Sequence, residues 1–126
     1  MAMQHSPGFL ALVQDALQRI TEVTREELAE RQRRGERWQL IDVREDHEWQ
    51  AGHLPGAQHL GKGILERDVE KRFPDPATPL VLYCGGGYRS ALAADVLQKM
   101  GYTRVLSLAG GYRGWCEAGL PVEKSV

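Results

Sequence analysis

Short apolar runs alternate with longer amphipathic stretches along the chain. Strands are predicted where apolar residues cluster with few charges, over residues 20–23 (ITEV), 37–43 (RWQLIDV), 79–84 (PLVLYC) and 104–108 (RVLSL). Apolar positions at helical spacing predict helices over residues 9–20, 24–35, 64–73 and 88–101, and a last short helix within 110–122. Residues 44–60 predict a loop with one helical turn, because HLPGA within them has turn chemistry.

This alternation predicts an α/β fold, with a central, mostly parallel sheet covered by helices on both faces. We expect an N-terminal helical extension over residues 1–19, followed by one domain over residues 20–126. Thr24 and Glu27 have the spacing of a capping box, which indicates a helix start. We expect residues 1–8 to be disordered. An apolar stripe on the extension is expected to pack on its own domain rather than on a second copy: Phe9, Val13, Ala16, Leu17 and Ile20.

The composition argues against several classes of function but does not identify one. The 126 residues suffice for one core, 42% of them are apolar, and the net charge of -1 gives no reason to expect nucleic-acid binding. Cys84 and Cys116 form no Cys-x-x-Cys motif and the four histidines complete no metal spacing, so we expect neither a metal nor another cofactor. No stretch approaches transmembrane length, and the first residues do not resemble a signal peptide. We therefore expect a cytoplasmic protein with reduced thiols and no membrane contact.

The stretch LVLYCGGGYRSALAAD places Cys84 at the end of a predicted buried strand. Ligands of open parallel sheets bind at the carboxyl ends of strands, and the free amides at a helix start attract anions. The glycines allow a tight curl, and we expect Gly86 and Gly87 to adopt backbone conformations that a β-carbon resists. With the cation of Arg89, these residues predict a nucleophilic thiolate in an anion-binding loop. The alternative is a small buried cysteine before an ordinary turn.

Three stretches resemble the signatures of the single-domain rhodaneses, a thiosulfate sulfurtransferase-like family. They are LIDVREDHEWQAGHLPGA (40–57), YCGGGYRS (83–90) and LAGGYRGW (108–115). The first has Asp42, Arg44 and Glu48 in place, with Trp49 where Phe or Tyr is more usual. The second has the spacing Cys-x4-Arg-Ser of the active-site loop. The resemblance covers about residues 20–122 and leaves the N-terminal extension outside it.

The resemblance implies a sulfurtransferase of the thiosulfate:cyanide type. In this family the loop cysteine takes the outer sulfur of a donor such as thiosulfate and holds it as a persulfide. Carried over, Cys84 is the catalytic nucleophile, and the substrate-binding residues are Gly85, Gly86, Gly87, Tyr88, Arg89 and Arg44. The implied partners are a small anionic sulfur donor and a thiol or cyanide acceptor, with a protein acceptor left open. No general base is visible beside Cys84, and none is required if the thiolate is preformed.

Two other functions stay open. Phosphatases of the same fold have a Cys-x5-Arg loop, whereas four residues separate Cys84 from Arg89, which favours a pocket for sulfur over one for phosphate. Many rhodanese-like domains are non-catalytic binding or regulatory modules, and these often lack the cysteine. Its presence favours an enzyme over a binding or redox-sensing module.

Several polar residues have a structural interpretation beside the functional one. Arg44 either contacts an anionic donor or pairs with an acidic residue that follows it, namely Glu45, Asp46 or Glu48. Asp42 is expected to accept backbone N–H bonds that organise the loop. Arg89 either contacts the donor or braces the loop through a carboxylate, and Tyr88 is expected in a pocket wall. Cys116 is expected in the core rather than as a resolving thiol.

Overall fold

The computed structural model describes residues 5–124. Its helices are α1 (Pro7–Leu17), α2 (Arg25–Arg33), α3 (Asp46–Ala51), α4 (Lys62–Arg72), α5 (Tyr88–Lys99) and α6 (Gly111–Glu117). Its strands are β1 (Thr21–Val23), β2 (Gln39–Asp42), β3 (Gln58–His59), β4 (Leu80–Tyr83) and β5 (Val105–Leu108).

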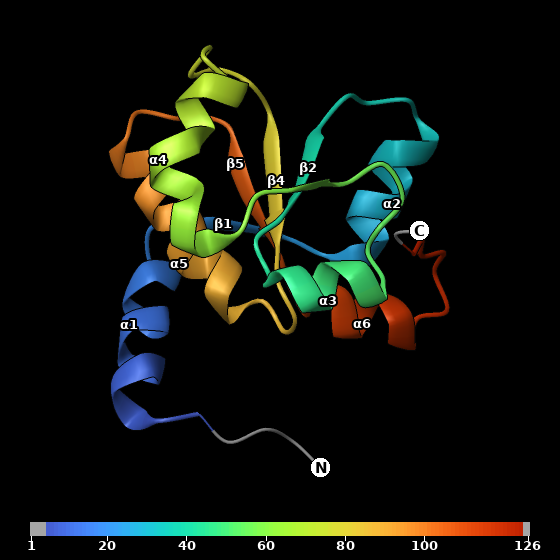
Figure 1. The fold of residues 1–126 in the computed structure, drawn as a ribbon, viewed down its shortest axis with the longest axis horizontal. Coiled ribbons are helices and arrows are strands. Elements are labelled where there is room, and N and C mark those ends of the chain that lie inside the picture. Colours follow the sequence, from blue (N-terminus) through green and yellow to red (C-terminus); the bar gives the residue numbers. More distant parts are fainter. Residues whose placement is uncertain (1–4, 125–126) are drawn as a thin grey trace.

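The strands form one sheet with the order β1-β5-β4-β2-β3, and every neighbouring pair is parallel. The predicted α/β fold with a parallel central sheet is therefore confirmed. Each residue of the central strand β4 is buried, which explains its continuous apolar sequence. Because parallel strands share one direction, the carboxyl ends of β2, β4 and β5 meet at the same edge, where the chain leads into α3, α5 and α6 (Figure 1).

Helices cover both faces of the sheet, and alternation along β4 separates the two cores. Leu80 and Leu82 belong to one apolar cluster, which they share with side chains of α4 and α5. Val81 and Tyr83 belong to the other, together with Leu28 of α2 and Trp115 of α6. The α4–α5 layer and the α2–α6 layer lie on opposite sides of the strands in Figure 1.

The N-terminal helix α1 lies against α5 (Figure 1). Val13 and Ala16 are buried in this contact layer, as the apolar stripe predicts. Leu17 is 37% exposed, so its assignment to the buried stripe is wrong. Arg19, just beyond the helix, donates hydrogen bonds of 2.9 and 2.8 Å to the carboxylate of Asp95 on α5. Both apolar packing and an ion pair therefore hold α1 on the domain.

The expected disorder of residues 1–8 is wrong where the structure describes them, because α1 already begins at Pro7. Residues 1–4 lie outside the described part of the chain. No helix within residues 5–124 combines the length and the apolar character needed to cross a membrane.

The segment over residues 44–60 holds more structure than the predicted loop with one turn. It contains α3 and the short strand β3, which pairs with the end of β2 through Ile41–Gln58 and Asp42–His59. The two residues of β3, Gln58 and His59, are polar and half-buried, so they show no apolar strand pattern in the sequence, and β3 was missed.

The predicted capping box at the start of α2, formed by Thr24 and Glu27, is confirmed.

Candidate active site

The candidate site lies where the chain leaves the central strand. Leu82 pairs with Ser107 and Asp42 pairs with Tyr83, so the ends of β2, β4 and β5 are level at the edge where Cys84 emerges. Cys84 is 1% exposed. The loop after it turns directly into α5, whose first residue is Tyr88.

The thiol of Cys84 receives hydrogen bonds from the loop that follows it. The backbone amides of Gly87 and Ser90 donate to Sγ, with N–S distances of 3.1 and 3.3 Å. The Ser90 hydroxyl lies 3.5 Å from Sγ and shares a 2.8 Å hydrogen bond with the hydroxyl of Ser107. Two backbone amides and a hydroxyl group therefore surround the sulfur of Cys84.

The loop also offers unused donors. Within residues 5–124, the amides of Gly85, Gly86, Tyr88 and Arg89 donate no hydrogen bond. Two of them belong to the first turn of α5, where amides have no partner within the helix. These four backbone donors are therefore available in the loop that follows Cys84.

Backbone conformation in the loop is constrained at Gly87, not at Gly86. Gly87 has a φ of +100°, and a β-carbon there would lie 3.2 Å from the amide nitrogen of Gly110. Gly86 has no left-handed φ, and a β-carbon on it would lie 3.5 Å from the guanidinium of Arg113, an ordinary contact. The expectation that Gly86 also needs a conformation reserved for glycine is therefore wrong.

The start of α6 holds the loop from the other side. The amide of Tyr112 donates to the Cys84 carbonyl at 2.8 Å, and the amide of Arg113 donates to the Gly85 carbonyl at 3.0 Å. Gly111 makes this approach possible: its φ is +56°, and a β-carbon would overlap the Cys84 carbonyl oxygen and lie 2.9 Å from the carbonyl of Gly85. The signature LAGGYRGW thus supplies a backbone clamp on the cysteine loop.

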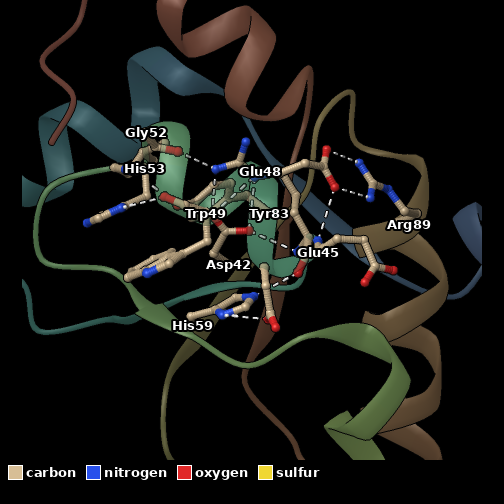
Figure 2. Close-up of polar contacts among 12 residues, drawn as sticks. Asp42, Glu45, Glu48, Trp49, Gly52, His53, His59, Tyr83 and Arg89 are labelled. Carbon is tan, nitrogen blue, oxygen red and sulfur yellow. Dashed lines mark hydrogen bonds and ion pairs between the residues drawn. The ribbon is translucent and has the colours of Figure 1, made fainter. Parts of the chain in front are cut away.

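Arg89 braces the loop through a carboxylate, one of its two predicted roles. Its Nη1 and Nη2 donate to Oε1 and Oε2 of Glu48 at 2.8 and 3.0 Å (Figure 2). The same carboxylate accepts a hydrogen bond from the Glu45 amide at the start of α3. The hydrogen bonds from Arg89 lower the pKa of Glu48 to about 2, against the burial that would raise it. They also raise the pKa of Arg89, so both partners stay charged across the physiological range.

Arg44 occupies a different environment from the one predicted. It is 4% exposed, and it binds the carboxylate of Asp42 and, at 2.6 Å, the carbonyl of Gly52. Its partner is thus Asp42 rather than one of the acidic residues that follow Arg44. Asp42 also accepts the Arg44 backbone N–H at 2.9 Å, which confirms its loop-organising role. Arg44 does not line the cavity beside Cys84.

A cavity of about 590 Å³ opens beside the thiol. Its lining combines the cysteine loop, the ion pair and three groups from other elements: His5, Phe9, Glu48, Cys84, Gly85, Gly86, Tyr88, Arg89 and Arg113. Tyr88 stands in this wall as predicted and is 39% exposed. The cavity therefore reaches from the buried sulfur to the surface.

The sequence did not identify several residues in or behind the cavity. Arg113 lies within the third signature but was given no role, and His5 precedes any recognisable pattern. Ser107 was missed as well, although it is the one polar residue of β5 and is 0% exposed. A polar residue in a buried strand is a signal that could have identified it.

The second cysteine lies away from this chemistry. Cys116 is exposed rather than in the core, so that prediction is wrong; its neighbour Trp115 takes the buried position on α6. Both cysteines are free thiols. Among residues 5–124, no three His, Cys, Asp or Glu side chains gather in a way that would hold a metal ion.

Comparison with known proteins points to one family. The family model described as a rhodanese-like domain matches residues 24–118. An uncharacterized protein of Bacillus subtilis, YqhL, is 39% identical over 77 residues, which are 61% of this chain and 60% of that protein. The thiosulfate sulfurtransferase GlpE of Haemophilus influenzae is 33% identical over 84 residues, which are 67% of this chain and 78% of that enzyme.

A solved structure from Rhodopseudomonas palustris matches almost the whole fold, with a TM-score of 0.80 and 30% sequence identity. The match covers 98% of this chain and 99% of that one. That protein is described as of unknown function and a possible tyrosine phosphatase.

Proposed function

The chain belongs to the rhodanese-like domain family, and we propose that it is a sulfurtransferase with Cys84 as the sulfur carrier. The donor is thiosulfate or a related sulfane-sulfur compound, and the acceptor is cyanide, a small thiol or a protein thiol. One observation carries the proposal: the Sγ atom of Cys84 accepts two backbone N–H bonds in a loop whose remaining amides have no partner among residues 5–124. The similarity to GlpE supports thiosulfate as the first donor to test.

In the first half-reaction, the Cys84 thiolate attacks the outer sulfur of thiosulfate. A new bond forms between Sγ and that sulfur, the S–S bond of thiosulfate breaks, and sulfite leaves with its electron pair. The negative charge moves onto the outer sulfur of the persulfide. Amides of Gly85, Gly86 and Tyr88, which have no partner in the described residues, are the donors for that charge.

In the second half-reaction, the acceptor attacks the outer sulfur. Cyanide becomes thiocyanate, or a thiolate acceptor becomes a persulfide. The S–S bond to Cys84 breaks, and its electron pair stays on Sγ, which becomes a thiolate again. The amides of Gly87 and Ser90 hold this thiolate in place for the next donor. No net redox partner is needed, because the sulfane sulfur is transferred from one nucleophile to another.

The direct test is mass spectrometry of the protein after incubation with thiosulfate. We expect one added sulfur atom, located on Cys84 and removed by cyanide or dithiothreitol. The Cys84→Ser variant should take up no sulfur, and the Cys116→Ser variant, altered at an exposed thiol, is the matched control that should behave like the wild type. Sulfur uptake by Cys84→Ser, or its loss in Cys116→Ser, would overturn the assignment.

Phosphatase activity is the second candidate, because the Rhodopseudomonas palustris protein is described as a possible tyrosine phosphatase. The loop favours sulfur transfer over it. Arg89, which would have to bind a phosphoryl group, is engaged at Nη1 and Nη2 by Glu48. Hydrolysis of an aryl phosphate by the wild type, without persulfide formation, would reverse the choice; failure of both activities would leave a binding or redox-sensing module.

A further inference from the structure

Two buried serine hydroxyls lie behind the sulfur of Cys84. Ser90 is in the first turn of α5, and Ser107 is in β5, where it pairs with Leu82 of β4. Both serines are 0% exposed and Cys84 is 1% exposed. The Ser90 hydroxyl lies 3.5 Å from Sγ of Cys84 and 2.8 Å from the Ser107 hydroxyl. Cys84, Ser90 and Ser107 therefore form one continuous hydroxyl chain inside the protein.

The Ser107 side chain has no role in apolar packing that would explain its position. The other three residues of β5 are apolar, and a buried hydroxyl is unfavourable unless it finds a partner. Among residues 5–124, the Ser107 hydroxyl makes one hydrogen bond to a side chain, and its partner is Ser90. The contact with Ser90 is thus what a serine supplies at this place in the strand.

The hydrogen bonds of this chain fit two charge states of Cys84 without any movement of heavy atoms. When Cys84 is a thiol, its S–H donates to the Ser90 oxygen, and Ser90 donates to Ser107. When Sγ carries a negative charge, Ser107 donates to Ser90, and Ser90 donates to Sγ. Both arrangements satisfy the geometry, because either oxygen of the serine pair can be the donor. The chain therefore provides a further donor at Sγ when charge develops there.

We propose that Ser107 is a positioning residue for the discharge of the persulfide, because it holds the Ser90 hydroxyl in the orientation that donates to Sγ. The proposal rests on the proposed function. The acceptor forms a bond to the outer sulfur, the S–S bond breaks, and its electron pair moves onto Sγ, while the Ser90 proton stays on its oxygen. A donor fixed at Sγ stabilises this leaving group in the transition state.

The same hydrogen bond has a different effect on the first half-reaction. Before Cys84 attacks thiosulfate, the charge is on Sγ and Ser90 already stabilises it. During the attack this charge moves away from Sγ, so the hydrogen bond weakens and does not accelerate the step. Loss of the Ser107 hydroxyl should therefore slow discharge of the persulfide and not its formation. This difference separates a positioning role from a merely structural one.

Single-turnover kinetics of the two half-reactions test this role in Ser107→Ala, which removes the hydroxyl with little change in volume. We expect the rate constant for sulfur transfer from the persulfide to cyanide to fall about three- to tenfold, the order of one neutral hydrogen bond. Persulfide formation from thiosulfate should not be slowed. Leu106→Ala, at the half-buried neighbour in β5, is the matched control: it should lower the melting temperature and keep the wild-type ratio of the two rate constants.

A double-mutant cycle tests whether Ser107 acts through Ser90. Ser90→Ala removes the hydroxyl that contacts Sγ and keeps the backbone amide, so it should slow discharge at least as much as Ser107→Ala. Ser90→Ala/Ser107→Ala should then be no slower than Ser90→Ala. Additive effects of the two substitutions, equal slowing of both half-reactions by Ser107→Ala, or no effect of Ser107→Ala on either, would overturn the proposal.

An infrared measurement distinguishes failure of this proposal from failure of the proposed function. The Cys116→Ser protein has one thiol, so the S–H stretching band of its thiol form reports on Cys84 alone. In this background we expect the band to move to higher frequency in Ser90→Ala, which loses the acceptor. It should move by a smaller amount in Ser107→Ala, where Ser90 is no longer polarised by its partner. An unmoved band in Ser107→Ala would overturn the hydroxyl chain, even if the wild type forms a persulfide. A shifted band without sulfur uptake by the wild type would reject the sulfurtransferase and keep the chain.

Discussion

Glu48 and Arg89 lie 41 positions apart in the sequence and form a two-point ion pair, with both carboxylate oxygens bound by the guanidinium. The pair joins the N-terminal signature to the cysteine loop. Glu48 is itself fixed by the Glu45 amide at the start of α3, so the position of α3 sets the position of Arg89. The conformation of the loop around Cys84 therefore depends on a helix with which it shares no backbone hydrogen bond.

Glu48→Gln should reduce both the activity and the stability of the protein. The amide side chain keeps the shape but loses the charge-assisted bonds to Arg89, and we expect kcat to fall about tenfold because the loop is less well ordered. Glu48→Asp shortens the side chain but keeps its charge, and it should fall between the wild type and Glu48→Gln. Steady-state kinetics with thiosulfate and cyanide give kcat for the three proteins and so test this order.

The same pair predicts a pH dependence of stability. The folded-state pKa of Glu48 is lowered from 4.5 to about 2, so its contribution to the free energy of unfolding is fully present above pH 4.5 and is lost as the pH falls towards 2. Denaturant unfolding should therefore show that the wild type loses more stability than Glu48→Gln between those pH values. Parallel curves for the two proteins would show that the pair does not stabilise the fold.

Gly87→Ala and Gly86→Ala form a matched pair of loop variants. At Gly87 the added β-carbon meets a left-handed φ and the amide nitrogen of Gly110, which costs about 1–3 kcal/mol and shifts an amide donor away from Cys84. We expect kcat to fall at least about tenfold for Gly87→Ala and to stay within about twofold for Gly86→Ala. A large effect at Gly86 with none at Gly87 would contradict the observed loop conformation.

The sequence predicted the place of Cys84 in the fold better than the surroundings of its loop. The end of a buried strand at Cys84, the loop after it and the start of α5 follow from short-range patterns, because a buried strand, a glycine run and a helix start are all local. The pairing of Arg89 with Glu48 could not be derived, since it depends on how α3 is oriented. The placement of Phe9 beside Tyr88 depends on the packing of α1 on α5, which an apolar stripe predicts only in general terms. Cys116 was misplaced because a short helix buries one face only, and Trp115 occupies it.

Arg44→Met tests whether Arg44 supports the fold rather than the donor. It leaves the fully buried carboxylate of Asp42 without its cation, which typically costs about 3–5 kcal/mol. We expect a large drop in the denaturant midpoint, while KM for thiosulfate in the folded protein stays within about twofold of the wild type. Arg37→Met, at an exposed position, is the control for loss of an arginine. A raised KM with unchanged stability would assign Arg44 to the donor instead.

Insertion of one alanine after Gly87 tests the loop length itself. The two amides that reach Sγ belong to Gly87, the N-cap of α5, and to Ser90 in its first turn, while the clamp from α6 holds the carbonyls of Cys84 and Gly85. An extra residue gives the loop the Cys-x5-Arg spacing, and the Ser90 amide can then no longer meet the sulfur while α5 keeps its packing. We expect persulfide formation from thiosulfate to fall at least about a hundredfold, because misplaced donors stabilise the anion poorly. An alanine inserted after Pro76, in the exposed loop before β4 and thus at the other end of that strand from Cys84, is the control that should retain activity and a similar melting temperature. Gain of aryl phosphate hydrolysis is not required, since a phosphatase also needs an acid for the leaving group. Full sulfur transfer by the lengthened loop would show that the convergence of the Gly87 and Ser90 amides on Cys84 is not what holds the sulfur.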